Sequence, residues 1–348
     1  MPPYLAAPCC TDYQLGIGLA AGERATLLAW LAQGAPEGDA GEAPDAAVAP
    51  AGGLSRVDVT LRMPEAYLPA PPPGSTDDNR CFVLPWPLAR GGYVTGLEAV
   101  PGARDVVHHL VVGAIAGEDA AIAEQRDRDD PLPGFSCNGG FGGIRNVTLL
   151  GGSLLGGDFP SGLGHRVEPG VRILLNVHYS TAHHGPRLDR TALRFRVDER
   201  ARGYEAIAAL NLAWLVADAM RIPAGDPDAT FFYQYRPTVS TRGARVWLWN
   251  VTAHMHEFAT RQRVMIVRAD GRRECLLEIP RWRFGWEQPY WFAAPKVLEP
   301  DDELYLECRF DNSAANQPVP GATPRDIAWG GDNQDMCVAF LAFTREAP

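Results

Sequence analysis

The chain has 348 residues, 46% of them hydrophobic, which is enough for two domains with cores of their own. Its net charge of −10, without any basic run, argues against a nucleic-acid partner. No apolar stretch is long enough to cross a bilayer, and no signal peptide is visible. The seven cysteines are widely spaced and form no CxxC pair, so we expect structural disulfides in a secreted or periplasmic protein.

Residues 1–53 differ in texture from the rest of the chain. From Glu23 to Gln33, apolar residues recur at helical spacing, and Gly34 follows as a suitable end for a helix. The next stretch is rich in Ala, Pro, Gly and acidic residues and has no periodicity. We therefore predict a short N-terminal helical segment and a linker.

From residue 54 onward, short and partly alternating apolar segments are separated by Gly, Pro, Asp and Asn. The 36 glycines and 30 prolines fit strands joined by turns better than long helices. We predict an all-β fold of two packed jelly-roll-like β-sandwich domains. The predicted first domain covers residues 54–198 and the second covers residues 199–348.

The eight histidines include three closely spaced pairs, of which His108-His109 and His254-x-His256 lie in strand-like sequence. His254 and His256 lie in a strand-like run, and side chains two apart on a strand share a face, so both can bind one metal ion. His108 and His109 are neighbours, which point to opposite faces of a regular strand. They can reach one ion only where the strand is bulged or strongly twisted. Without a bulge, one of them is a core residue and the other is exposed.

The remaining histidines are less informative. His178 ends an apolar run and is either a buried core residue or a ligand, with Asn176 on the same face as a possible hydrogen-bond partner. His165, His183 and His184 lie in Gly- and Pro-flanked sequence, and we expect them at the surface. A metal or substrate contact from His183 or His184 is the alternative.

Ligand type narrows the choice of metal. Neutral imidazoles suit copper, zinc or iron, and an added thioether favours Cu(I). A blue-copper carrier needs a cysteine and a histidine close together before a methionine, and the sequence has no such group. Another possibility is a mononuclear iron or zinc enzyme that uses His254, His256 and Glu257. In a regular strand, however, Glu257 points away from both histidines.

The order of these motifs resembles the copper type II, ascorbate-dependent monooxygenases, which include the peptidylglycine α-hydroxylating and dopamine β-hydroxylating enzymes and bacterial relatives. The resemblance covers roughly residues 55–345 and is strongest around DVVHHLVVGA, RILLNVHYS and the C-terminal run that contains DMCVAF. It implies two jelly-roll-like domains with one copper on each, facing each other across a cleft. The implied ligands are His108, His109 and His178 for one copper, and His254, His256 and Met336 for the other.

The implied activity is hydroxylation of a substrate C–H bond with O2 and an external reductant such as ascorbate. Its catalytic ligands are Met336, His254 and His256, because O2 binds at the methionine-containing site in this family. The alternative, from another functional class, is a copper-binding or copper-sensing protein that keeps both sites without turnover.

Departures from the family pattern concern the substrate. Peptide-amidating members have an arginine two residues before the His-x-His motif, where this chain has Thr252. The family's Asn and Tyr after the methionine are Val338 and Phe340 here. We expect these three positions to line the substrate pocket, and together they argue against a peptidyl-glycine substrate.

The resemblance also implies disulfides and bears on haem. The implied disulfides are Cys81–Cys137 and Cys308–Cys337, which leaves Cys9, Cys10 and Cys275 without a predicted partner. The N-terminal segment resembles the end of a c-type cytochrome domain, but the chain contains no CxxCH motif, so we expect no haem. The other interpretation of this segment is an arm that docks on the first domain.

Overall fold

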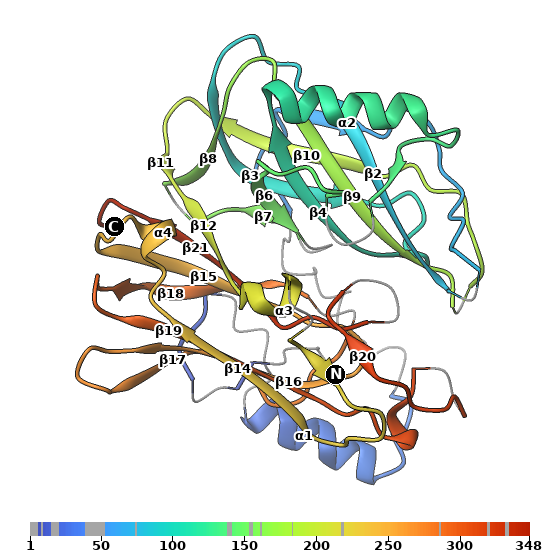
Figure 1. The fold of residues 1–348 in the computed structure, drawn as a ribbon, viewed down its shortest axis with the longest axis vertical. Coiled ribbons are helices and arrows are strands. Elements are labelled where there is room, and N and C mark those ends of the chain that lie inside the picture. Colours follow the sequence, from blue (N-terminus) through green and yellow to red (C-terminus); the bar gives the residue numbers. More distant parts are fainter. Residues whose placement is uncertain are drawn as a thin grey trace.

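The computed structural model confirms the predicted all-β fold, with two packed sandwiches and one N-terminal helix (Figure 1). It describes residues 6–7, 10–14, 21–38, 53–73, 75–137, 141–152, 156–160, 162–182, 184–216, 219–284, 287–318, 321–330 and 334–348. The helices are α1 (Ala21–Ala32), α2 (Gly117–Asp129), α3 (Leu212–Val216), α4 (Thr238–Thr241) and the 3-10 turn η1 (Ala314–Asn316). No described helix has the length and apolar character needed to span a membrane.

The first sandwich contains strands β1 to β11. They are β1 (Val59–Arg62), β2 (Asp77–Pro85), β3 (Gly92–Val100), β4 (Val107–Ile115), β5 (Phe135–Ser136), β6 (Thr148–Gly152), β7 (Gly157–Asp158), β8 (Leu163–Val167), β9 (Arg172–Ser180), β10 (Ala192–Asp198) and β11 (Arg202–Gly203). One sheet has the order β5-β2-β9-β4-β6, and the other has the order β1-β10-β3-β8-β11, with β7 beside β3. Their facing side chains form one apolar core, which includes Phe82, Leu175 and Phe195.

Strand β9 is buried along both faces, which explains its nearly continuous apolar sequence. One face contributes Leu175 and Val177 to the core between the sheets. The other face, with Leu174, lies under α2, whose Ala120 and Ala123 are buried against the sheet. The strand is thus held on both sides, which gives His178 near its end a fixed position.

The second sandwich contains strands β12 to β21. They are β12 (Glu205–Ala209), β13 (Arg221–Ile222), β14 (Ala229–Tyr235), β15 (Val246–His254), β16 (Ala259–Val267), β17 (Arg273–Ile279), β18 (Pro289–Leu298), β19 (Glu303–Phe310), β20 (Ile327–Ala328) and β21 (Val338–Thr344). Its two antiparallel sheets have the orders β12-β21-β15-β18 and β14-β19-β16-β17, and β13 pairs with β20. A second apolar core lies between these sheets and includes Leu248, Leu306 and Phe343.

The chain passes from one sandwich to the other at Tyr204. Strand β11 pairs with β8 of the first domain, and β12 pairs with β21 of the second. The crossover therefore lies shortly after the boundary that we placed between residues 198 and 199.

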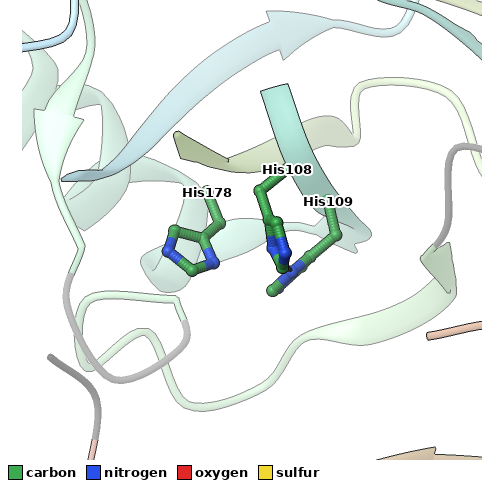
Figure 2. A group of neighbouring side chains, drawn as sticks. All are labelled: His108, His109 and His178. Carbon is green, nitrogen blue, oxygen red and sulfur yellow. Dashed lines mark hydrogen bonds between the residues drawn. The ribbon is translucent and has the colours of Figure 1, made fainter. Parts of the chain in front are cut away.

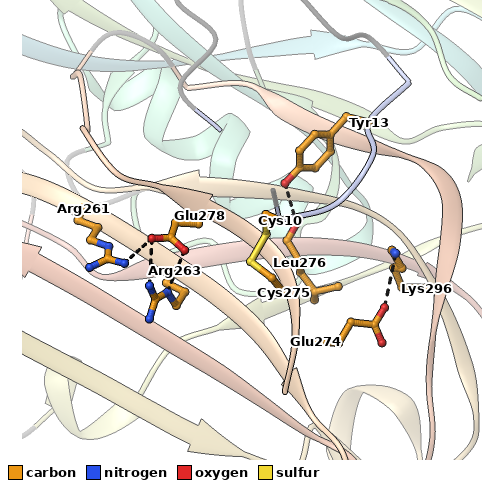
Figure 3. Close-up of a disulfide and its surroundings, with 9 residues drawn as sticks. All are labelled: Cys10, Tyr13, Arg261, Arg263, Glu274, Cys275, Leu276, Glu278 and Lys296. Atoms are coloured by element: carbon orange, nitrogen blue, oxygen red, sulfur yellow. Dashed lines mark hydrogen bonds and ion pairs between the residues drawn. A yellow bond between two sulfur atoms is a disulfide. The ribbon is translucent and has the colours of Figure 1, made fainter. Parts of the chain in front are cut away.

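The N-terminal arm, residues 10–14, docks on the second domain rather than on the first (Figure 3). Cys10 forms a disulfide with Cys275 of β17, with a Cα–Cα distance of 5.2 Å. The Tyr13 hydroxyl donates a hydrogen bond to the carbonyl of Leu276 at 2.9 Å. The interpretation of this segment as an arm that docks on the first domain is therefore wrong about the domain. The cross-link joins residues 265 positions apart, which local sequence patterns do not show.

Helix α1 matches the predicted helix of residues 23–33 to within a few residues at its start. Gly34 follows it with a φ of 85°, the left-handed conformation that glycine adopts readily and that commonly ends helices. The helix lies beside the second domain in Figure 1. Cys9 and most of the linker fall outside the described residues.

Both disulfides implied by the resemblance are present. The Cα–Cα distances are 5.7 Å for Cys81–Cys137 and 5.8 Å for Cys308–Cys337. The first joins β2 to the residue after β5, under α2. The second joins β19 to the residue directly after Met336, and so restrains the segment that carries this methionine.

Removing the second bridge should weaken both the fold and the site beside it. In a Cys308→Ala/Cys337→Ala variant, we expect the free energy of unfolding to fall by roughly 3–4 kcal/mol, because the bridge closes a loop with a sequence separation of 29. Urea unfolding measures this loss. The Cys81→Ala/Cys137→Ala variant is the control. It should leave metal affinity at His254 and His256 unchanged. An equal loss of that affinity in both variants would show that the Cys308–Cys337 bridge has no specific effect on the second site.

Candidate metal sites

Three histidines of the first domain lie together on the adjacent strands β4 and β9 (Figure 2). His109 is paired with His178, and the register shifts between Val107 and His109, so His108 lies in a bulge. This is the irregularity that two neighbouring histidines need in order to face one ion. One ligand nitrogen from each ring lies within 4.8 Å of the others.

Hydrogen bonds determine which ring nitrogens remain available in this set. The Nδ1 atoms of His108 and His109 lie 3.1 Å apart. The Nε2 atom of His178 is 3.1 Å from an Asp77 carboxylate oxygen, which leaves Nδ1 of His178 for a metal. Asp77 was missed in the sequence analysis, which named Asn176 as a possible hydrogen-bond partner. Asn176 lines the same cavity, but the partner that the structure shows for His178 is Asp77.

The second histidine pair lies at the end of β15. Alternation along this strand turns Val251 and Ala253 into the core, whereas Thr252 and His254 face a cavity. His256 lies just beyond the strand, and its ring centroid is 5.1 Å from that of His254. Met336 lines the same cavity. The structure thus brings all three predicted ligands of the second site to one wall.

Each ring of this pair is also held through Nδ1, so Nε2 is left for a metal. His256 Nδ1 is 3.1 Å from the carbonyl oxygen of Gln334. His254 Nδ1 is 2.9 Å from a carboxylate oxygen of Glu287. The pairing of Thr252 with Pro289, continued by two residues, places Glu287 opposite His254. Burial opposes ionisation of Glu287, but the nearby His254 lowers the pKa of this carboxyl to about 2.

A buried carboxylate, that of Asp335, connects the two segments of the second site. It accepts hydrogen bonds from the backbone N–H groups of His256, Phe258 and Met336 at 2.7, 3.0 and 2.8 Å. Burial raises the pKa of Asp335 to about 7, although the three N–H donors favour the charged form. Asp335 thereby fixes the backbone of Met336 beside the His-x-His segment.

The two sites face each other across one cavity of about 1600 Å³ at the domain interface. The ring centroids of His109 and His254 are 6.3 Å apart. Phe284 of the second domain lies between the sets, 4.3 Å from the ring of His108 and 5.9 Å from that of His256. His109 and His178 of the first set and both histidines of the second set therefore line a single cavity.

The three positions expected to contact substrate line this cavity. Strand pairing sets Thr252 beside Phe340 and His254 beside Val338. The wall next to the second site is therefore an alkyl group, an aromatic ring and one hydroxyl. No cationic side chain occupies these three positions.

The other histidines give mixed results. His165 was expected at the surface, but it lies on β8 and is only 3% exposed, because the strand turns it into the domain interface. His184 is exposed, and His183 lies outside the described residues. Among the described His, Cys, Asp and Glu residues, the first-domain histidines form the one set of three within 4.8 Å. His254, His256 and Glu257 do not form such a set.

Comparison with known proteins gives no functional guidance. The sequence matches no protein-family model and no curated protein. A peptide-N(4)-(N-acetyl-β-D-glucosaminyl) asparagine amidase structure is similar with a TM-score of 0.34 and 9% identity, covering 83% of this chain and 97% of that one. The VP2 subviral particle of infectious bursal disease virus has a TM-score of 0.19 and 10% identity, covering 83% and 75%. Similarities this weak carry no argument.

The two orienting carboxylates should each control one metal site. Glu287→Gln is expected to weaken copper binding at His254 and His256 about 10- to 100-fold, because an amide holds the imidazole less firmly than a carboxylate does. Asp77→Asn is the matched control and should weaken the His108, His109 and His178 site instead. Competition titration against a copper chelator measures both affinities. If each variant weakened both sites equally, the assignment of one carboxylate to each site would be wrong.

The metal-free protein should lose stability as the pH falls below about 6.5. Burial lowers the pKa of His108 and His256 to about 4 and that of His165 to about 3, so the unfolded chain binds protons that the folded chain does not. Burial lowers the pKa of His109 as well, so four buried histidines act in this direction. The raised pKa values of Asp335, His254, Glu257 and Asp127 act in the opposite direction. Thermal unfolding between pH 7.5 and 4.5 in the presence of a chelator tests this. His108→Ala should reduce the loss of stability at low pH, and substitution of the exposed His184 by Ala should leave that loss unchanged.

Proposed function

We propose that this chain is a dicopper monooxygenase that hydroxylates a substrate C–H bond with O2 and an external reductant such as ascorbate. The observation that carries the proposal is that one cavity is lined by His109 and His178 of one domain and by His254, His256 and Met336 of the other, with His108 grouped beside the first two. The order of these ligands in the sequence also resembles the ascorbate-dependent copper monooxygenases.

The residues fit copper by ligand type. The first site offers three imidazoles, and the second offers two imidazoles and a thioether, a soft ligand that favours Cu(I) and has little use in a zinc site. Bound copper would supply electron transfer and the activation of O2, which protein side chains cannot supply. The pKa of His108 is lowered to about 4 by burial, so this ring is neutral and can bind metal near neutral pH.

The protein's own contribution is orientation and recognition. Asp77 and Glu287 each hold one imidazole, and Asp335 holds the backbone that carries Met336. Substrate would lie against Val338 and Phe340, next to His254. Because Thr252 is not a cation, it cannot neutralise a substrate carboxylate at this position. We therefore propose a substrate other than a peptidyl-glycine.

We also propose that the protein works in an oxidising compartment. Three disulfides join described residues, and such bonds persist in secreted and periplasmic proteins. We infer a secreted or periplasmic enzyme, where external reductants and O2 are both available.

Substitution of Met336 and of His108 should abolish turnover for different reasons. The wild-type chain is expected to bind about two copper ions. Met336→Ala removes the thioether but leaves two imidazoles, so copper should bind at this site more weakly. His108→Ala should lower the copper content at the first site and leave the second intact. Metal analysis and ascorbate-dependent O2 consumption over a substrate panel measure these effects.

Met265→Ala is the control for Met336→Ala, because Met265 lies on β16 outside the cavity and should keep turnover. Full activity of Met336→Ala with unchanged copper spectra would show that the methionine assignment is wrong. Two bound copper ions without O2 consumption for any substrate would instead favour the copper-binding or copper-sensing alternative.

A further inference from the structure

Four rings form a cluster at the part of the cavity farthest along β15 from His254. Phe159 and His165 come from the first domain, Tyr204 from the crossover and Trp291 from β18. The ring centroids of His165 and Tyr204 are 3.6 Å apart. Phe159 lies 5.7 Å from Tyr204 and 6.0 Å from Trp291. All four rings line the cavity, so the cluster is also part of its wall.

His165 is a buried polar side chain on the cavity wall. It is 3% exposed, and among the described residues its ring has no hydrogen-bond or ion-pair partner. Burial alone lowers its pKa to about 3, so the ring is neutral. The hydroxyl of Tyr204 likewise has no hydrogen bond to a described residue. Buried polar groups are normally satisfied, so an unpaired imidazole on a cavity wall indicates a ligand that pairs with it.

Strand pairing gives the distance between this cluster and the second metal site. Trp291 is opposite Asn250 on β15, and Glu287 lies opposite His254, four residues further along. A strand rises about 3.3 Å per residue, so the backbone positions are roughly 13 Å apart. Thr252 lies between them on the same wall. A molecule that contacts both ends must therefore be elongated.

We propose that Phe159, His165, Tyr204 and Trp291 form a recognition subsite for a neutral, flat aromatic group that carries a hydrogen-bonding substituent. The aromatic rings supply stacking and edge contacts, and His165 and Tyr204 pair with the substituent. The inference rests on the proposed function in one respect, because the occupant is then the distal end of an elongated substrate whose reacting carbon lies near His254.

The charges around the cluster favour a neutral group over a cation. Asp158 precedes Phe159, and its carboxylate is 2.7 Å from a guanidinium nitrogen of Arg196. Glu205 follows Tyr204, and its carboxylate is 2.7 Å from Arg345. Both carboxylates next to the rings are thus already neutralised by arginines. A cation would find aromatic faces there, but the carboxylates of Asp158 and Glu205 are already paired with arginines.

Binding of simple probes to the full-length, copper-free chain tests the subsite independently of turnover. The probes are 2-naphthol, 2-methylnaphthalene, which lacks the hydroxyl, and tetramethylammonium, a cation. Titration calorimetry, supported by quenching of tryptophan fluorescence, gives the affinities. We expect 2-naphthol to bind more tightly than either of the other two probes.

His165→Phe keeps a ring and removes the polar nitrogens. The affinity of this variant for 2-naphthol should therefore fall about three- to tenfold, and its affinity for 2-methylnaphthalene should stay unchanged. Tyr204→Phe serves the same purpose and keeps the test decisive if His165→Phe does not fold. Trp291→Ala should weaken binding of both naphthalene probes. His184→Phe, at an exposed position, is the matched control and should bind as the wild type does.

Failure to bind 2-naphthol, equal affinity for 2-naphthol and 2-methylnaphthalene, or tighter binding of tetramethylammonium would each overturn the subsite. So would unchanged 2-naphthol affinity in both His165→Phe and Tyr204→Phe. Because no copper is present, these results do not depend on catalysis. A chain that binds 2-naphthol as expected but never consumes O2 would keep the subsite and remove the proposed monooxygenase function.

Discussion

The carboxylate of Asp335 receives backbone N–H groups from two segments that are 79 residues apart. One segment carries His254 and His256, and the other carries Met336. A buried carboxylate with three N–H donors fixes backbone positions precisely, because each donor would otherwise be left unpaired in the interior. The Cys308–Cys337 bridge restrains the same segment from its other side. The backbone that carries the ligands of the second site is therefore held in place by protein contacts alone.

The sequence predicted the features that depend on local patterns. Alternating apolar segments predicted the all-β fold. Adjacent His108 and His109 could face one ion only in a bulged or strongly twisted strand, and the structure contains such a bulge. It missed features that depend on long-range register. Asp77 reaches His178 from a different strand, and Glu287 reaches His254 only because β18 pairs with β15. In the printed sequence, each is one acidic residue among many.

The prediction that His165 lies at the surface was wrong for a related reason. Its Gly- and Pro-flanked sequence is typical of a surface loop, yet the short strand β8 places it where the two sandwiches meet. Burial at a domain interface depends on how two folded units pack, and no pattern within either unit records it. The Cys10–Cys275 pair could not be predicted from local patterns either, since the bonded residues are 265 positions apart in the sequence.

The docking of the N-terminal arm has a consequence for the order in which the chain assembles. Tyr13 bridges to Phe292 of β18, and the arm's cysteine is bonded to β17, so the second domain is built from both ends of the chain. During synthesis, the residues of the first sandwich are made before strands β17 and β18, so the arm can dock only after these later strands have been made. Closure of Cys10–Cys275 is then a late step, and its rate depends on thiol oxidation rather than on strand pairing.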